Sequence, residues 1–82
     1  MKSHQVIEKI RELVESGRKN ITIMAEDKDA HKYEVRVIAM PELSKNEING
    51  SAAVVIDGNH YRDMTLKAVM PIFDHMITAS VK

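Results

Sequence analysis

The sequence predicts an α+β fold, a two-layer sandwich in which an antiparallel sheet of three to four strands carries two helices on one face. Three observations support this: an apolar stripe with helical spacing near the N-terminus, two short segments with alternating apolar residues, and turn-forming residues between the strand segments. Short antiparallel connections with both helices on one side of the sheet produce this architecture. The predicted order is helix, strand, strand, strand, a short fourth strand or turn, helix.

We expect one domain over residues 1–82, because two domains of half this length would each lack a workable core. The chain has no cysteine, which excludes disulfides and zinc–thiolate sites as sources of stability. Small domains without these often gain stability by oligomerisation. The 12 basic and 12 acidic residues cancel, so long-range repulsion does not oppose self-association.

The N-terminal residues lead into an amphipathic segment and not into an apolar one, so the sequence predicts no signal peptide. No apolar run approaches the roughly 18–20 residues that a membrane-spanning helix needs. We therefore expect a cytoplasmic protein without a membrane partner.

The first helix is predicted over residues 4–16. Its apolar residues fall on one stripe of a 3.6-residue helix and are Val6, Ile7, Ile10, Leu13 and Val14. Ser3 is a suitable N-cap, and Gly17 can end the helix in the left-handed conformation. The opposite side carries charged residues of both signs, which is typical of a solvated face.

Two strands that form an antiparallel hairpin are predicted next, because apolar residues alternate over residues 21–26 and 33–39. The turn between them is rich in Asp, and Pro41 ends the second strand because it has no N–H for the ladder. The inward-facing set is then predicted to be Ile21, Ile23, Tyr33, Val35 and Val37.

Residues 41–50 are predicted to be a connector. Residues 44–47 fit a capping box and Gly50 could close one helical turn, although Asn49 and Gly50 could instead form a tight turn. Residues 52–56 are apolar on both sides, which favours a central or doubly covered strand, with Val54 and Ile56 facing the helices. Asp57 and Gly58 then form a strong hairpin signal, and the returning residues 59–62 form a short strand or only a turn.

The C-terminal segment has two interpretations. Helical spacing over residues 63–79 favours one long helix, kinked at Pro71 and capped by Asp63 or Thr65, and its stripe contains Leu66, Val69, Met70, Phe73 and Ile77. In the alternative, a strand continues through Met64, Leu66, Ala68 and Met70, and a shorter helix begins at Pro71. We favour the long kinked helix.

Catalytic chemistry has little support in the sequence. His4, His31, His60 and His75 are scattered and form no H-x-H or H-x-x-x-H pair, the spacings that place two ligands on one side of an element. Each glycine lies where a turn or cap requires one, so there is no phosphate loop. We expect a non-enzymatic protein with no catalytic, metal or cofactor site.

Nucleic-acid binding is a disfavoured alternative, because chains that bind phosphate backbones normally carry net positive charge. The residues that would carry it are Arg18, Lys19, Lys28, Lys32 and Arg36. The order helix, three strands, helix is similar to that of double-stranded RNA-binding domains. Those domains present a basic N-terminus on the last helix, whereas residues 63–67 here offer one lysine.

The outward side of the sheet is the main candidate for a function. If the inward set packs on the helices, the other side receives Met24, Ile38, Val55 and Met40, and a contiguous apolar strip there would be an interaction surface. We expect a protein-interaction module that forms a homodimer or binds a protein partner through this face or a sheet edge. Met24, Ile38 and Val55 would be apolar anchors, and Glu34 and Arg36 would set the register. Small, neutral, cysteine-free domains of this kind are often encoded by a phage or mobile element, and inhibitors of host or defence proteins are among them.

Overall fold

A computed structural model describes residues 2–39 and 50–82 of the chain, without the side chains of Ala39, His60 and Tyr61. Its elements are α1 (Ser3–Glu15), β1 (Asn20–Asp27), β2 (Lys32–Ala39), β3 (Gly50–Ile56), β4 (Asn59–Thr65), α2 (Leu66–Val69), the 3₁₀ helix η1 (Met70–His75) and β5 (Met76–Val81).

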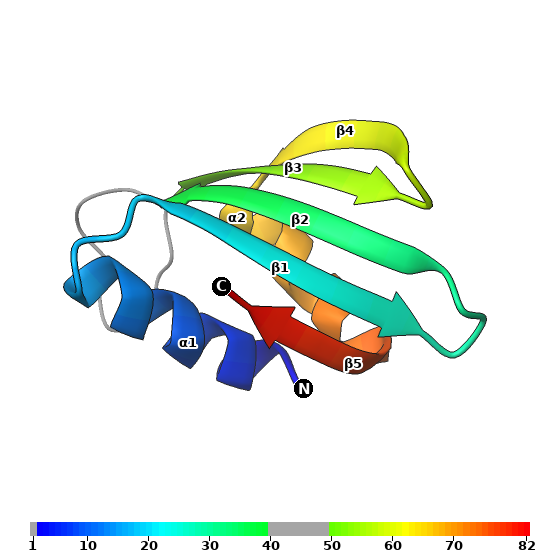
Figure 1. The fold of residues 1–82 in the computed structure, drawn as a ribbon, viewed down its shortest axis with the longest axis horizontal. Helices are drawn as coiled ribbons and strands as arrows, with labels where there is room; N and C mark the ends of the chain where they lie inside the picture. The colour runs from blue at the N-terminus through cyan, green and yellow to red at the C-terminus, as the bar shows by residue number, and fades with distance from the viewer. Residues whose placement is uncertain (1, 40–49) are drawn as a thin grey trace.

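The five strands of the described residues form one antiparallel sheet in the order β4-β3-β2-β1-β5 (Figure 1). The first four strands follow one another as a meander. The chain then returns through α2 and η1 and adds β5 beside β1. Helices cover one face, so the predicted two-layer α+β sandwich is confirmed, with five strands in place of three to four.

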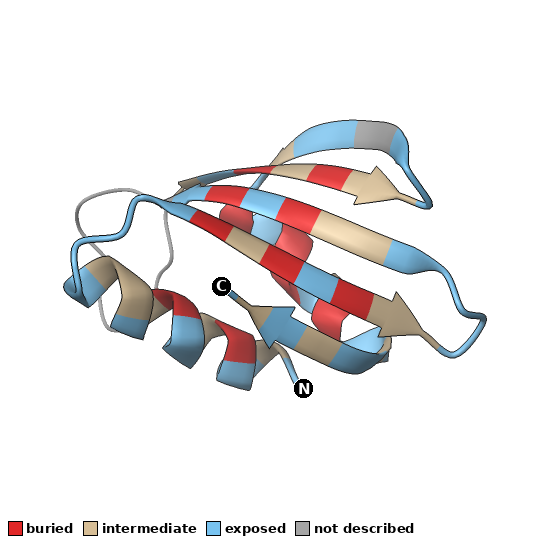
Figure 2. Cartoon of the chain, in the orientation of Figure 1, coloured by how far each residue is buried: buried red, intermediate tan, exposed pale blue. Residues whose placement is uncertain are grey.

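The core lies between the sheet and the helical layer (Figure 2). Its buried residues are Val6, Ile10, Ile21, Ile23, Ala25, Val35, Val37, Ala52, Val54, Leu66, Val69, Met70 and Phe73. The alternation in β1 and β2 therefore predicted the inward face correctly, with Tyr33 and Ile56 partly buried against the same core. Phe73 is the largest residue among those that are fully buried.

Helix α1 begins one residue earlier than predicted. Its N-cap is Lys2 and not Ser3, and the Lys2 backbone N–H donates to Gln5 Oε1 over 2.8 Å. The N–H of Ser3 instead donates to Asp74 Oδ1 over 3.0 Å, which ties the start of α1 to η1. The helix ends at Glu15, one residue earlier than predicted, but Gly17 has the predicted left-handed conformation, with φ +97°, and the N–H of Arg18 donates to the Leu13 carbonyl.

The hairpin turn at Asp57 and Gly58 is confirmed. Both residues have positive φ, 50° and 83°, which is typical of a type I′ turn. Strand β3 is central, between β2 and β4, as predicted. It begins at Gly50, two residues before the predicted strand, so Gly50 is a strand residue and not the end of a helical turn. The described helices cover only one of its faces. Met40 and the proposed capping box at residues 44–47 lie outside the described residues.

The long C-terminal helix over residues 63–79 is wrong. Residues 63–65 belong to β4, only Leu66–Val69 is α-helical, and Met76–Val81 is a strand. Pro71 explains the change, because it has no N–H to continue α-helical bonding and stands instead in the first turn of η1. The predicted Thr65 cap is present, since Thr65 Oγ1 accepts from the Ala68 N–H over 3.2 Å.

Among the described residues, no helix has the length and apolar character needed to cross a membrane.

Candidate functional site

The side of the sheet opposite the helices, called the outer face below, is formed by the alternate residues of each strand. The described helices leave it open (Figures 1 and 2). The strand register arranges its central residues in three rows across β1, β2 and β3. These rows are Met24, Glu34 and Val55; Thr22, Arg36 and Ala53; and Asn20, Ile38 and Ser51.

The three predicted anchors all have their place on the outer face. Met24 is 42% exposed and Ile38 is 58% exposed, whereas Val55 is partly buried. They do not form a contiguous strip. Glu34 lies between Met24 and Val55, and Ile38 is four residues further along β2, roughly 13 Å away at the rise of a strand. The outer face therefore carries separate apolar side chains among polar ones.

Glu34 and Arg36, predicted to set the register of a complex, bind each other in the free chain. Arg36 Nε donates to Glu34 Oε2 over 2.9 Å, and Arg36 Nη2 lies 2.8 Å from the same oxygen. The Arg36 side chain is mostly exposed, so the stabilisation from this pair is small. The pair presents both signs of charge at the centre of the outer face.

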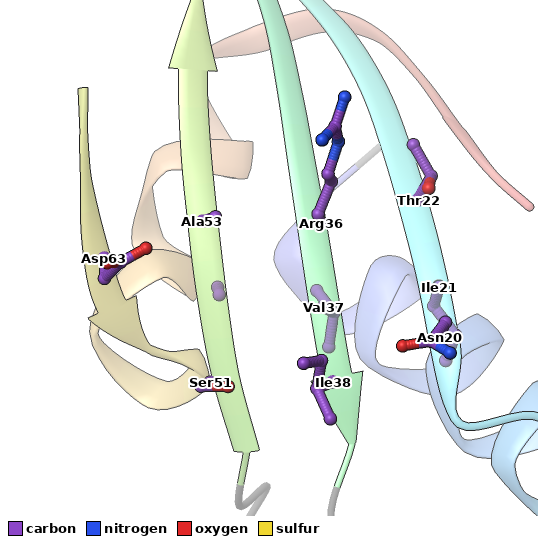
Figure 3. Close-up of a pocket in the computed structure, with 10 residues that line it drawn as sticks. Asn20, Ile21, Thr22, Arg36, Val37, Ile38, Ser51, Ala53 and Asp63 are labelled. Atoms are coloured by element: carbon purple, nitrogen blue, oxygen red, sulfur yellow. The ribbon is translucent and has the colours of Figure 1, made fainter. Parts of the chain in front are cut away.

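A hollow of about 610 Å³ lies beside this pair, where small side chains lower the surface of β3 (Figure 3). Ala53 and Ser51 form its floor, Arg36 and Ile38 stand along β2, and Asp63 stands on β4. The sequence did not indicate this hollow. It arises because the register places Ala53, whose side chain is short, between the longer side chains of Arg36 on β2 and Asp63 on β4.

The adjacent turns of the two hairpins are joined by a second cluster of polar groups. His31 Nδ1 lies 2.7 Å from Asp57 Oδ2, and the N–H of Lys32 donates to Asp57 Oδ1 over 2.9 Å. The N–H of Asp57 returns a bond of 2.8 Å to the Lys32 carbonyl. Asp27 organises its own turn by accepting from the N–H groups of Asp29 and His31.

The contact between His31 and Asp57 favours the charged form of both side chains. The hydrogen bond that His31 donates to Asp57 and the negative charges of Asp57 and Asp27 raise the pKa of His31. The backbone N–H of Lys32 and the His31 ring lower the pKa of Asp57. Both side chains are about half exposed, and the pair joins the turn after β1 to the turn after β3.

His4 lies in the first turn of α1 and His75 is the last residue of η1, and both are exposed. His60 lies in β4, and its side chain is outside the described residues. Within the part of the chain that the structure describes, no group of three or more His, Cys, Asp or Glu residues could hold a metal ion.

The five basic residues considered for nucleic-acid binding do not form one patch. Arg18 and Lys19 precede β1, whereas Lys28 follows it, and the eight residues of β1 separate them by roughly 26 Å. Lys32 and Arg36 lie on the outer face, where Arg36 is paired with Glu34. Arg18 donates from Nη2 to the Asn20 carbonyl over 3.0 Å.

Comparison of the chain with protein-family models, with curated protein sequences and with solved structures gave no match.

Proposed function

We propose that this chain is a non-enzymatic protein-interaction module that self-associates and docks a protein partner on its outer face. The observation that carries the proposal is the exposure of Met24 and Ile38 on a sheet face that no described helix covers. Ile38 stands at the border of the hollow, and an exposed apolar side chain beside a pocket is a common anchor of a protein interface. A partner would be inhibited or recruited by occupation of its surface.

The outer face fits a protein surface of mixed character. Ile38 borders the hollow and offers an apolar contact, while Arg36 and Asp63 offer opposite charges on its two sides. A protruding apolar side chain of the partner would fill such a hollow, and the partner's polar and charged residues would lie at its rim. The Glu34–Arg36 pair would then select the orientation of the partner more than it would add affinity.

The docking part is tested with tagged wild type, Ile38→Asp and Ala68→Asp. Ala68 is exposed on α2, in the other layer, so this control adds the same charge away from the outer face. We expect wild type and Ala68→Asp to retain one protein from a lysate. Purified, that protein should bind Ile38→Asp at least tenfold more weakly, because a buried unpaired carboxylate replaces an apolar contact.

Equal retention by all three chains would contradict docking at the outer face. Retention of nucleic acid, weakened by salt and by Lys32→Glu, would replace the proposal by the nucleic-acid alternative. The self-association part is tested by sedimentation over a range of concentrations. We expect a faster species to grow with concentration, and a monomer at every concentration would contradict this part.

A further inference from the structure

The two edges of the sheet differ in how they are protected. At the β4 edge, the pairing with β3 shifts register between Val54 and Val55, which marks a β-bulge. The same strand carries Arg62 and Asp63. Bulges and charged side chains are the usual features that prevent an edge strand from pairing with another molecule. The β4 edge is therefore poorly suited to strand addition.

The β5 edge has no such protection over its regular part. No charged residue occurs in Met76–Val81, and Thr78 and Ser80 are exposed. The shift in its pairing with β1 lies at the beginning of the strand, beside Ile77, so the stretch from Thr78 onward pairs regularly. An uncharged strand with β-branched residues at a sheet edge is a template for another strand.

The hydrogen bonds to β1 show which backbone groups of β5 point outward. The N–H of Lys82 donates to the Thr22 carbonyl over 2.9 Å, and the N–H of Thr22 donates to the Lys82 carbonyl over 3.0 Å. Hydrogen-bonded and non-hydrogen-bonded residues alternate in an antiparallel ladder. The backbone N–H and C=O groups of Ser80 therefore also point toward β1. Those of Ala79 and Val81 point away from the sheet.

We propose that this edge pairs with the β5 edge of a second copy, antiparallel, with Ser80 opposite Ser80 on a two-fold axis. This inference rests on the proposed self-association and specifies the surface through which two copies associate. The register pairs Ala79 with Val81 of the second copy, and Val81 with its Ala79. Both outward N–H groups and both outward carbonyls of each chain are then bonded.

The residues at the axis suit a second copy of this chain. Ser80 meets its own equivalent, so two short hydroxyl side chains face each other and no like charges are opposed. The chain as a whole has a formal net charge of zero, so it does not repel itself at long range. Because the same edge is used on both chains and the β4 edge is protected, the assembly closes as a dimer.

The dimer would extend the outer face. A two-fold axis between antiparallel edge strands runs perpendicular to the sheet, so both outer faces lie on one side of a continuous ten-strand sheet. Met24 pairs with Ser80 in the β1–β5 ladder, so one Met24 would flank the junction on each side. The hollow beside Ile38 lies further from the axis and stays open in both chains.

A cysteine at the axis tests the pairing, and the cysteine-free chain makes any introduced thiol unique. Opposed residues in a non-hydrogen-bonded pair have Cα atoms about 4.5 Å apart, within the range that a disulfide spans. We expect Ser80→Cys to form a covalent dimer under mild oxidation. The control Ala68→Cys, which lies on α2, should remain largely monomeric under the same conditions.

A charge at the axis provides an independent measurement. Ser80→Asp would place two carboxylates opposite each other, and we expect the dimer to dissociate at least tenfold more readily by sedimentation. Ala68→Asp and Ile38→Asp should dimerise as wild type. Circular dichroism of Ser80→Asp checks that the exposed substitution leaves the fold intact.

The outcomes separate this inference from the proposed function. Failure of Ser80→Cys to cross-link, or an unchanged dimer in Ser80→Asp, overturns pairing at β5. A dimer that persists in Ser80→Asp and weakens in Ile38→Asp overturns the edge and keeps self-association, through the outer face. A wild type that is monomeric at every concentration overturns both the inference and the self-association on which it rests.

Discussion

Phe73 lies on η1 and belongs to the buried core between the helical layer and the sheet, and none of it is exposed. We expect Phe73→Ala to lower the free energy of unfolding by about 3–5 kcal/mol, because it removes apolar contacts and leaves a cavity. A domain of this size has little stability to spare. Urea denaturation followed by circular dichroism measures the loss. Phe73→Leu should lose clearly less, and an equal loss in both would contradict the cavity argument.

The His31–Asp57 pair predicts a dependence of stability on pH. The raised pKa of His31 means that its contribution is full below the unfolded value of 6.5 and is lost as the pH rises through the folded value. The lowered pKa of Asp57 means that its contribution is full above 3.8 and is lost as the pH falls. The pair therefore stabilises most between these two limits.

The variant His31→Gln isolates this effect. We expect wild type to have a higher urea midpoint than His31→Gln at pH 5.5, and the difference to shrink as the pH rises from 5.5 to 8.5, because the imidazole loses its proton when the pH passes the folded pKa. A difference that stays constant between these two pH values would show that the ring stabilises the turn without its charge.

The partner of His31 could not be predicted from the sequence. Asp29 lies closer to it along the chain, but Asp29 uses its backbone N–H to bind Asp27. Asp57 is 26 positions away and reaches His31 only because the β2–β3 register pairs Tyr33 with Ile56 and brings the two turns together. Local spacing contains no information about such a contact, which depends on strand order and register.

The β3–β4 hairpin depends on a turn that favours glycine. Gly58 has φ +83°, and a Cβ added there would meet no atom within 4 Å. We expect Gly58→Ala to destabilise the fold by about 1–2 kcal/mol, entirely through the left-handed backbone. Thermal or urea unfolding measures the change. Gly58→Asn is the matched control and should lose less, because Asn adopts this conformation more readily.

The elements that the sequence predicted well are those with a strong local signal. The stripe and Gly17 defined α1, and alternation with a turn defined β1 and β2. The C-terminal segment failed because its stripe is real only as far as Phe73. Met76 and Ile77 continue the helical spacing by chance, and tertiary pairing with β1 makes them part of a strand. Ile77 is 60% exposed, as a residue of the supposed stripe would not be.

At the scale of the whole molecule, the outer face is uncovered because all described helical segments lie on the other side of the sheet. The sequence indicated which residues of β1, β2 and β3 point outward, because strand alternation fixes this directly. It did not show how they are grouped. Glu34 separates Met24 from Val55, and the row of Arg36 separates both from Ile38, which follows from the pairing of three strands. The fifth strand, which creates the β5 edge, was likewise beyond local patterns.

Hydrogen exchange should reveal the assembly at the scale of the whole sheet. In a dilute monomer, we expect the backbone N–H groups of Ala79 and Val81 to exchange rapidly, because they point away from β1, whereas the N–H of Ser80 is protected within the ladder. If β5 pairs with a second copy, raising the protein concentration should slow exchange at Ala79 and Val81. It should leave the N–H groups in the central strands β1 and β2 almost unchanged, since these are already bonded on both sides of each strand.

Ser80→Asp should remove the concentration dependence. Slowing that is uniform over the whole sheet would indicate general stabilisation, and slowing confined to β4 would place the contact at the opposite edge.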